Sequence, residues 1–229
     1  MRVRLPHASL SVSGLRVSGY LALTALCALL LAPLVRAGKG FVKPVAEAAG
    51  KYPAHDVHSD EKVGIAADPY DTAEKAKIFS VNFKDHGCLP VFFVITNDGN
   101  QPISIAHMED MLITAHRSKL TPIAMEDLYR KLSNPTANTG PNPFPIPRKT
   151  VKSGISKKEM EEIDSSQFEA RAVEPHGTQS GFLFFDVADI DSPLTGANMD
   201  ITGVTDAKGH ELMYFEIPMD SYLKPGAKP

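Results

Sequence analysis

Residues 82–105 read NFKDHGCLPVFFVITNDGNQPISI, and this stretch carries the strongest signal for the fold. PVFFVIT at 90–96 is an unbroken run of apolar and β-forming residues, which is typical of a strand buried on both faces or central in a sandwich. NDGN at 97–100 is a turn sequence in which Gly99 can adopt a positive φ, and QPISI then resumes an alternating pattern. The sequence therefore predicts a β-hairpin over 90–105 at the centre of the fold.

Further strands are expected on both sides of this stretch, separated by Gly-, Pro- and Asp-containing turns. They are predicted at 62–70, 79–83, 110–118, 174–187, 197–206 and 210–218, with the last two forming a second hairpin. About seven short antiparallel strands predict a mostly β chain with an immunoglobulin-like β-sandwich fold. The chain has no Trp, so it lacks the Cys…Trp…Cys signature of true immunoglobulin domains.

Two helices and a proline-rich loop are expected as an insertion at 121–170. The segment 121–132 has helical periodicity, and the proline-rich segment 133–150 is expected to cross as an extended loop. SKKE at 156–159 has the form of a capping box, in which Ser156 and Glu159 bond to each other's backbone N–H. We expect the second helix to run from this box to about residue 170.

The N-terminal 37 residues have the features of a signal peptide. Basic residues precede YLALTALCALLLAPLV at 20–35, an uncharged run of signal-peptide length that is short for a membrane span. Val35 and Ala37 satisfy the small-residue rule for cleavage before Gly38. An uncleaved N-terminal anchor is the alternative. With cleavage, no membrane insertion is expected of the mature protein, and the protein is predicted to be periplasmic or secreted.

The mature chain is expected to be acidic and to form one domain. Cleavage removes four of the 24 Lys and Arg residues and none of the 27 acidic ones, which leaves a net charge near −7. Nucleic acid is therefore not an expected partner, because binding it requires clustered cations. Residues 38–61 show no sustained period, and we interpret them as a flexible tether, either mobile or loosely docked. HDVHSDE at 55–61 is interpreted as a solvated part of this tether, with weak binding of a transition metal as the alternative. The β-sandwich domain is predicted over 62–223.

Cys88 is the only cysteine left after cleavage, so no disulfide within the mature chain is possible. A lone thiol can be buried filler, an intermolecular partner or a reactive group, and filler is the favoured interpretation. The more specific alternative is a metal site, because Cys88 lies two residues after His86 and soft ligands suit copper or zinc. The side chains that could complete such a site are those of His107, Met108, Met111 and His116. We predict no catalytic, cofactor or metal residue.

Two segments resemble those of uncharacterised bacterial exported immunoglobulin-like β-sandwich proteins. PVFFVITNDGNQPISI at 90–105 is similar to their central hairpin, and EPHGTQSGFLFFDV at 174–187 is similar to a later strand that follows a Pro-Gly turn. The resemblance implies an extracytoplasmic β-sandwich, in a group where some members are lipid-anchored and a few are inhibitor-like or adhesive. The helical insertion at 121–170 departs from that pattern, and no functional residue is carried over.

The sequence favours a non-enzymatic function. The GxSxG and HExxH motifs and the phosphate-binding loops are absent. We therefore expect an exported binding or accessory protein of the bacterial cell envelope, with a protein partner and no cofactor. Residues 133–155, especially Phe144 and Ile146, are the predicted contact surface, although both side chains could equally pin the loop to the sheet. The alternative function is periplasmic copper or zinc binding.

Overall fold

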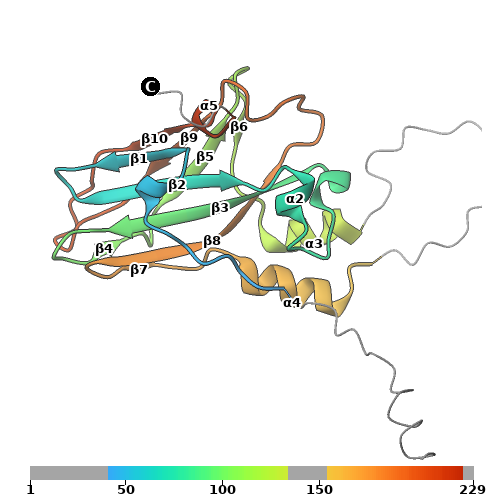
Figure 1. The fold of residues 1–229 in the computed structure, drawn as a ribbon, viewed down its shortest axis with the longest axis horizontal. Coiled ribbons are helices and arrows are strands. Elements are labelled where there is room, and N and C mark those ends of the chain that lie inside the picture. The colour runs from blue at the N-terminus through green and yellow to red at the C-terminus, as the bar shows by residue number, and fades with distance from the viewer. Residues whose placement is uncertain (1–40, 134–153, 224–229) are drawn as a thin grey trace, which may run out of the picture. The chain divides into compact units, whose positions relative to one another are not determined.

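The computed structural model describes residues 41–133 and 154–223, which are mostly β. One antiparallel sheet contains, in spatial order, β1 (His55–His58), β2 (Val63–Pro69), β3 (Cys88–Asn97) and β8 (Gly177–Asp186). A second antiparallel sheet contains β10 (Phe215–Pro218), β9 (Asn198–Thr202), β5 (Glu109–Ile113) and β6 (Lys119–Leu120). The short strands β4 (Ile103–Ser104) and β7 (Ala172–Val173) pair with each other (Figure 1).

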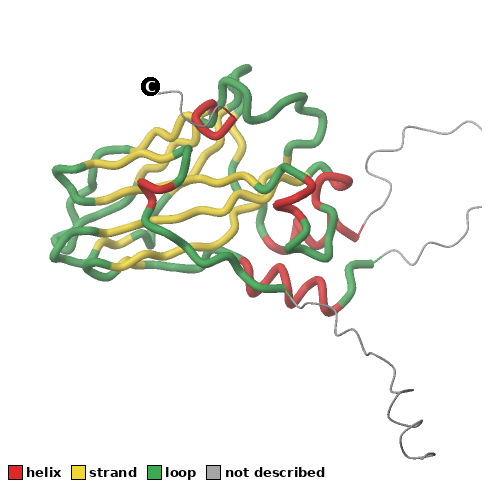
Figure 2. The backbone as a smooth tube through the Cα atoms, in the orientation of Figure 1, coloured by secondary structure: helices red, strands yellow, loops and turns green. Residues whose placement is uncertain are grey.

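Short helices connect and flank these strands. They are η1 (Ala49–Lys51), α2 (Ala73–Ala76), η2 (Phe83–His86), α3 (Met125–Ser133), α4 (Lys157–Ser166) and α5 (Asp220–Leu223). Figure 2 shows α2, η2, α3 and α4 gathered toward one end of the first sheet. Thr72 caps α2 by accepting a hydrogen bond from the backbone N–H of Lys75 at 3.4 Å.

The long apolar strand β3 separates two hydrophobic cores. Its odd-numbered residues, such as Phe93, enter a core that both four-stranded sheets share. Its even-numbered residues, such as Phe92, enter a second core that Leu128 of α3 and Ile163 of α4 complete. Because side chains alternate across a strand, only an uninterrupted apolar run can serve both cores. The prediction of a strand buried on both faces is confirmed, since every residue of β3 is buried.

The predicted hairpin over 90–105 is wrong. β3 pairs with β2 on one edge and β8 on the other, so no edge is left for β4, which pairs with β7 instead. Asn97 directs the chain after β3 toward β7. Its Nδ2 donates to the carbonyl of Gln101 at 2.8 Å and to the carbonyl of Val173 in β7 at 3.1 Å. Its Oδ1 accepts from the N–H of Gly99 at 2.9 Å. The chain does turn at NDGN as predicted, but the strand that follows, β4, pairs with β7 and not with β3.

The prediction of a flexible tether over 38–61 is wrong for residues 49–58. β1 pairs with β2 along its full length, and Ala49 and Ala54 are completely buried. The backbone N–H of Ala49 donates to the hydroxyl of Thr96 on β3 at 2.9 Å. Small residues without periodicity fit closely against the sheet here, so the domain boundary predicted at 62 lies too late in the chain.

Both predicted helices of the insertion are present and shorter than expected. α3 begins at Met125 rather than 121, because the edge of β8 holds the preceding residues extended, with the N–H of Ile123 donating to the carbonyl of Phe184 at 2.7 Å. The capping box of Ser156 and Glu159 is confirmed at the start of α4. α4 ends at Ser166 rather than near 170, since the next residues bond to β8.

Two further predictions have opposite outcomes. The hairpin of the C-terminal half is confirmed, because β9 and β10 pair in antiparallel register. The strand expected at 79–83 is not formed, and the chain there makes bends that lead into η2. Phe79, Val81 and Phe83 are nevertheless all buried in the second core. The alternation of apolar and polar residues therefore predicted which side chains are buried there, but it predicted the wrong backbone conformation.

Candidate functional site

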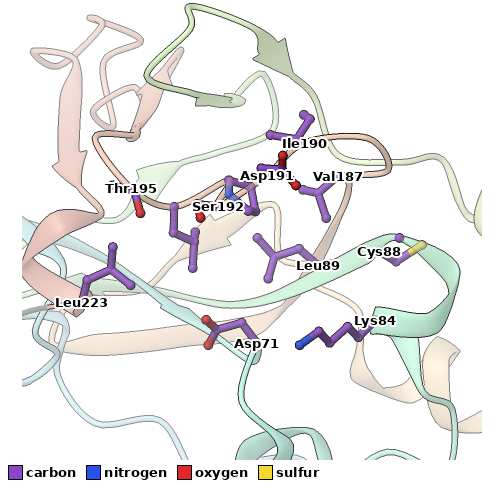
Figure 3. A pocket seen from close by; sticks show the side chains of 13 residues that line it. Asp71, Lys84, Cys88, Leu89, Val187, Ile190, Asp191, Ser192, Thr195 and Leu223 are labelled. Carbon is purple, nitrogen blue, oxygen red and sulfur yellow. The ribbon is translucent and has the colours of Figure 1, made fainter.

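A hollow of about 450 Å³ lies beside the start of β3, close to the His86-x-Cys88 sequence. It is bounded by β3, the loop between β8 and β9, and residues next to α2 and at the end of α5 (Figure 3). The lining residues are Asp71, Lys84, Gly87, Cys88, Leu89, Val187, Ile190, Asp191, Ser192, Pro193, Leu194, Thr195 and Leu223. Its volume lies within the roughly 300–1,000 Å³ typical of ligand sites.

Gly87 shapes one wall of this hollow. It ends η2 with a φ of 62°, in the left-handed region that favours glycine. A Cβ at this position would lie 2.9 Å from the Cβ of Ala188, so the loop after β8 can approach closely only because the side chain is absent. The carbonyl of Gly87 accepts from the N–H of Val187 at 2.9 Å. The sequence HGC therefore forms a turn that positions the β8–β9 loop.

Asp186 fixes the same loop from the end of β8. Its Oδ1 accepts from the N–H of Ala188 at 3.0 Å and from Nζ of Lys131 at 2.6 Å. Lys131 belongs to α3, so the ion pair joins the helical insertion to the base of the loop. Both contacts hold the loop in place before any ligand is present, which lowers the entropic cost of binding.

Apolar and charged side chains both line the hollow. Leu89, Ile190 and Leu194 supply apolar side chains. Asp71 and Lys84 lie on the same side of the hollow in Figure 3. A lining that combines apolar side chains with a few charged groups suits an apolar group carried by a polar ligand or by a polypeptide.

Tyr222 of α5 precedes Leu223, which lines the hollow. Its hydroxyl donates to Oδ1 of Asp71 at 2.6 Å, and Nζ of Lys75 lies 4.5 Å from the centre of its ring. Burial, together with the bond to Asp71 and the nearby negative charge, raises the pKa of Tyr222 well above its ordinary value. The phenol therefore stays protonated and keeps its bond, which holds α5 and the neighbouring Leu223 in place.

Cys88 lines the hollow without offering its sulfur to it. Sγ points away from the other lining side chains (Figure 3) and donates to the carbonyl of His86 at 3.7 Å. Burial raises the pKa of the Cys88 thiol to about 11, with Lys131 lowering it and Asp186 raising it further. The thiol is therefore protonated at neutral pH, whereas nucleophilic attack and metal binding both require the thiolate. The geometry supports the interpretation of Cys88 as apolar filler.

The six residues considered for a copper or zinc site are not brought together. Cys88 enters the second core, whereas Met108 packs against the first core, on the opposite face of the sheet. Met111 is half-buried on β5, and His107 and His116 are exposed in the segments flanking that strand. Within 41–133 and 154–223, no three His, Cys, Asp or Glu side chains are arranged to hold a metal ion. Phe144 and Ile146 lie outside the described residues.

A polar cluster that the sequence interpretation missed joins the edges of the two sheets. Nε2 of His58 lies 3.1 Å from Oδ2 of Asp56, and Nδ1 lies 2.9 Å from Oε2 of Glu61. The ring of His58 stacks on Phe215 of β10, with ring centres 4.0 Å apart and planes 12° apart. We call the side chains of Asp56, His58 and Glu61 the seam cluster.

The seam cluster was overlooked because HDVHSDE was interpreted as part of the tether. One local signal was available: Asp56 and His58 are two residues apart, and residues so spaced share one face of a strand. That signal is weak without knowledge of the partner, because Phe215 and its neighbours lie more than 150 positions further along the chain.

Comparisons with protein-family models, curated proteins and solved structures found no match to this chain. The roles assigned to the hollow and to the seam cluster therefore rest on their own geometry. Across residues 41–133 and 154–223, no helix combines the length and apolar character that crossing a membrane would need.

Proposed function

We propose that this chain is an exported, non-enzymatic binding protein of the bacterial cell envelope, built on an immunoglobulin-like β-sandwich. Two antiparallel four-stranded sheets that share one hydrophobic core support the sandwich. The apolar run at 20–35 and the small residues at 35 and 37 support export and cleavage before Gly38.

The observation that carries the binding function is the hollow beside β3. We infer that it accepts an apolar side chain from a partner protein, with Lys84 and Asp71 of the lining contacting the polar surroundings of that side chain. Binding hot spots of this kind place one apolar anchor in a pocket and surround it with polar contacts. The β8–β9 loop supplies much of the lining, and loops on a rigid β-scaffold are common binding elements.

Protonated Cys88 supports a non-enzymatic function at this site. Its thiol has a raised pKa and belongs to the second core, so it offers almost no thiolate to the hollow at neutral pH. The remaining side chains of the lining offer shape, apolar surface and charge, which are the requirements of binding.

Binding is tested with the Ile190→Glu variant. Ile190 is half-buried in the loop that lines the hollow, so a carboxylate there would place charge against the incoming apolar group. The purified protein is immobilised, and partners captured from envelope extract are quantified by mass spectrometry. We expect Ile190→Glu to lose the specific partner while the circular dichroism spectrum stays unchanged.

The matched control is Val45→Glu, which adds the same charge at a side chain that is 91% exposed and outside the hollow. It should capture the partner as the wild type does. Equal capture by Ile190→Glu and wild type would reject the hollow as the binding site, and equal loss in both variants would show a non-specific charge effect.

Export is tested separately by the mass of the protein recovered from the envelope fraction of an expressing bacterium. Removal of residues 1–37 and an N-terminus at Gly38 are expected. A protein that keeps these residues and sediments with membranes would instead support the uncleaved anchor.

A further inference from the structure

Polar groups lie at the seam between the two sheets. β1 is an edge strand of the first sheet, β10 is an edge strand of the second, and the two lie side by side (Figure 1). Edge strands present backbone N–H groups without strand partners, and proteins commonly cover them. Here the N–H of Glu216 donates to Oδ2 of Asp56 at 3.0 Å, and the N–H of Met213 donates to Oε1 of Glu61 at 2.9 Å.

His58 connects the two covering carboxylates through both of its ring nitrogens. A neutral imidazole has one N–H and one lone pair, whereas an imidazolium has two N–H groups. Only the imidazolium can therefore donate to Asp56 and to Glu61 at the same time. Stacking on the fully buried Phe215 holds the ring in the plane that reaches both carboxylates.

The charged groups near His58 are mostly acidic, and Lys62 is the cation among those named here. On β10 and the segment before it, Glu216 bonds to Asn198 and Glu211 bonds to the N–H of Gly203. On β9, Asp200 is the register partner of Glu216. In the turn after β1, Asp60 and Lys62 are exposed, and the neighbouring residues of β2 are apolar. Within the described part of the chain, the ion-pair partner of Asp56 and of Glu61 is His58.

We propose that the seam cluster is a pH-operated latch, closed when His58 is protonated and opened when it loses its proton. In the closed state the imidazolium bridges both carboxylates. Each carboxylate also accepts from one backbone N–H, that of Glu216 in β10 or that of Met213 just before β10. After proton loss, one carboxylate faces a ring lone pair and is repelled. The carboxylates also lose the positive charge that they share. Their hydrogen bonds to the N–H groups of Met213 and Glu216 therefore weaken, and residues 213–216 are released as pH rises.

The segment that the latch releases carries two exposed large side chains. Met213 is 68% exposed and Tyr214 is 58% exposed, directly before the buried Phe215. Release would expose the backbone N–H groups of Met213 and Glu216 and loosen the cover that His58 provides for Phe215. Histidine side chains in general change charge between about pH 5 and 8, so these are the two pH values to compare.

Amide hydrogen exchange followed by NMR tests the latch on the purified protein. Protection factors, which remove the intrinsic effect of pH on exchange, are measured at about pH 5 and about pH 8. We expect protection of the Met213 and Glu216 amides to fall roughly tenfold at the higher pH, as loss of a charge-assisted hydrogen bond implies. Protection of the Val94 amide in β3 should stay constant.

Two variants separate the latch from a general effect of pH. His58→Gln should give low protection at Met213 and Glu216 at both pH values, with no pH-dependent step. His210→Gln removes another histidine that contacts a carboxylate, that of Asp206 at 3.2 Å, and should keep the step. A step that persists in His58→Gln, or wild-type protection that is equal at both pH values, would overturn the proposal.

The wild-type protein provides a second readout that needs no variant. The ¹⁵N shifts of the His58 ring should report two protonated nitrogens at low pH and one at high pH. The midpoint of that change should match the midpoint of the amide exchange step, and different midpoints would also overturn the latch.

Discussion

Glu162 of α4 binds the backbone N–H of Ser80 with both carboxylate oxygens, each at 3.1 Å. The hydroxyl of Ser80 lies 3.4 Å from the same carboxylate. Glu162 is only 5% exposed and lies next to Ile163, which enters the second core. A buried carboxylate without such partners would be costly, so this contact fixes α4 against the chain between α2 and η2.

Replacing Glu162 by Gln should destabilise the protein by about 1–3 kcal/mol. Gln keeps the size of the side chain, but it replaces one acceptor oxygen with a donor that faces the N–H of Ser80. The measurement is urea unfolding followed by circular dichroism. The control is Glu161→Gln, a neighbouring exposed residue that contacts Lys157 at 3.5 Å, which should change stability by less than about 0.5 kcal/mol. Equal stability of the two variants would contradict the anchoring role.

Gly181→Ala should be strongly destabilising. A Cβ on Gly181 of β8 would lie 2.4 Å from Cα of Phe168 and 2.6 Å from the carbonyl of Gln167, both of which are backbone atoms. The chain leaving α4 crosses β8 at this point, so the variant must separate two packed segments, at a cost of about 3 kcal/mol or more. Gly154→Ala is the control, because nothing lies within 4 Å of its added Cβ. Thermal unfolding of both variants decides the point, and a melting temperature near that of the control would contradict the close crossing.

Asp110 should make the protein less stable as pH rises from about 4 to about 6. Burial raises the pKa of Asp110 from its ordinary value to about 6, although its own backbone N–H lowers it. Between the unfolded and folded pKa values the folded state holds more protons, so the free energy of unfolding falls with rising pH and levels off above about 6.

Asp110→Asn removes this titration. The variant should be about 1–2 kcal/mol more stable than the wild type at pH values above about 6 and nearly equal to it near pH 4. Urea unfolding across this range measures the difference. Glu109→Gln, at the exposed neighbouring position, should follow the wild type at every pH. A constant difference between Asp110→Asn and wild type would show that burial of the carboxyl is not its cause.

Cys88 should be unreactive in the native protein. Its thiol is buried, and its pKa is raised to about 11, so almost no thiolate is present at pH 8. A chromogenic thiol reagent should label it within seconds in denaturant and only very slowly without denaturant. Cys88→Ala carrying Val45→Cys places a thiol at an exposed position and should react at once. Rapid native labelling of Cys88 would contradict its burial and reopen the reactive and metal-binding interpretations.

Features that depend on contacts close in sequence could be predicted. The capping box of Ser156 and Glu159 needs only four consecutive residues, and the β9–β10 hairpin joins neighbouring strands. The double burial of β3 was also predictable, because an unbroken apolar run is stable only where both faces leave water. Cys88 lies in the same strand just before that run, and its interpretation as filler came from the usual burial of free cysteines.

Features that depend on distant pairing were decided only by the tertiary structure. A turn sequence at NDGN allows a hairpin, but β2 and β8 occupy both edges of β3, so β4 pairs with β7. The loop at 187–195 forms a hollow only because η2 and α5 lie beside it. The residues HDVHSDE look solvated in isolation and become a seam cluster only against β10. Local periodicity thus determined which side chains turn inward, whereas competition among strands for hydrogen-bonding edges determined which segments meet.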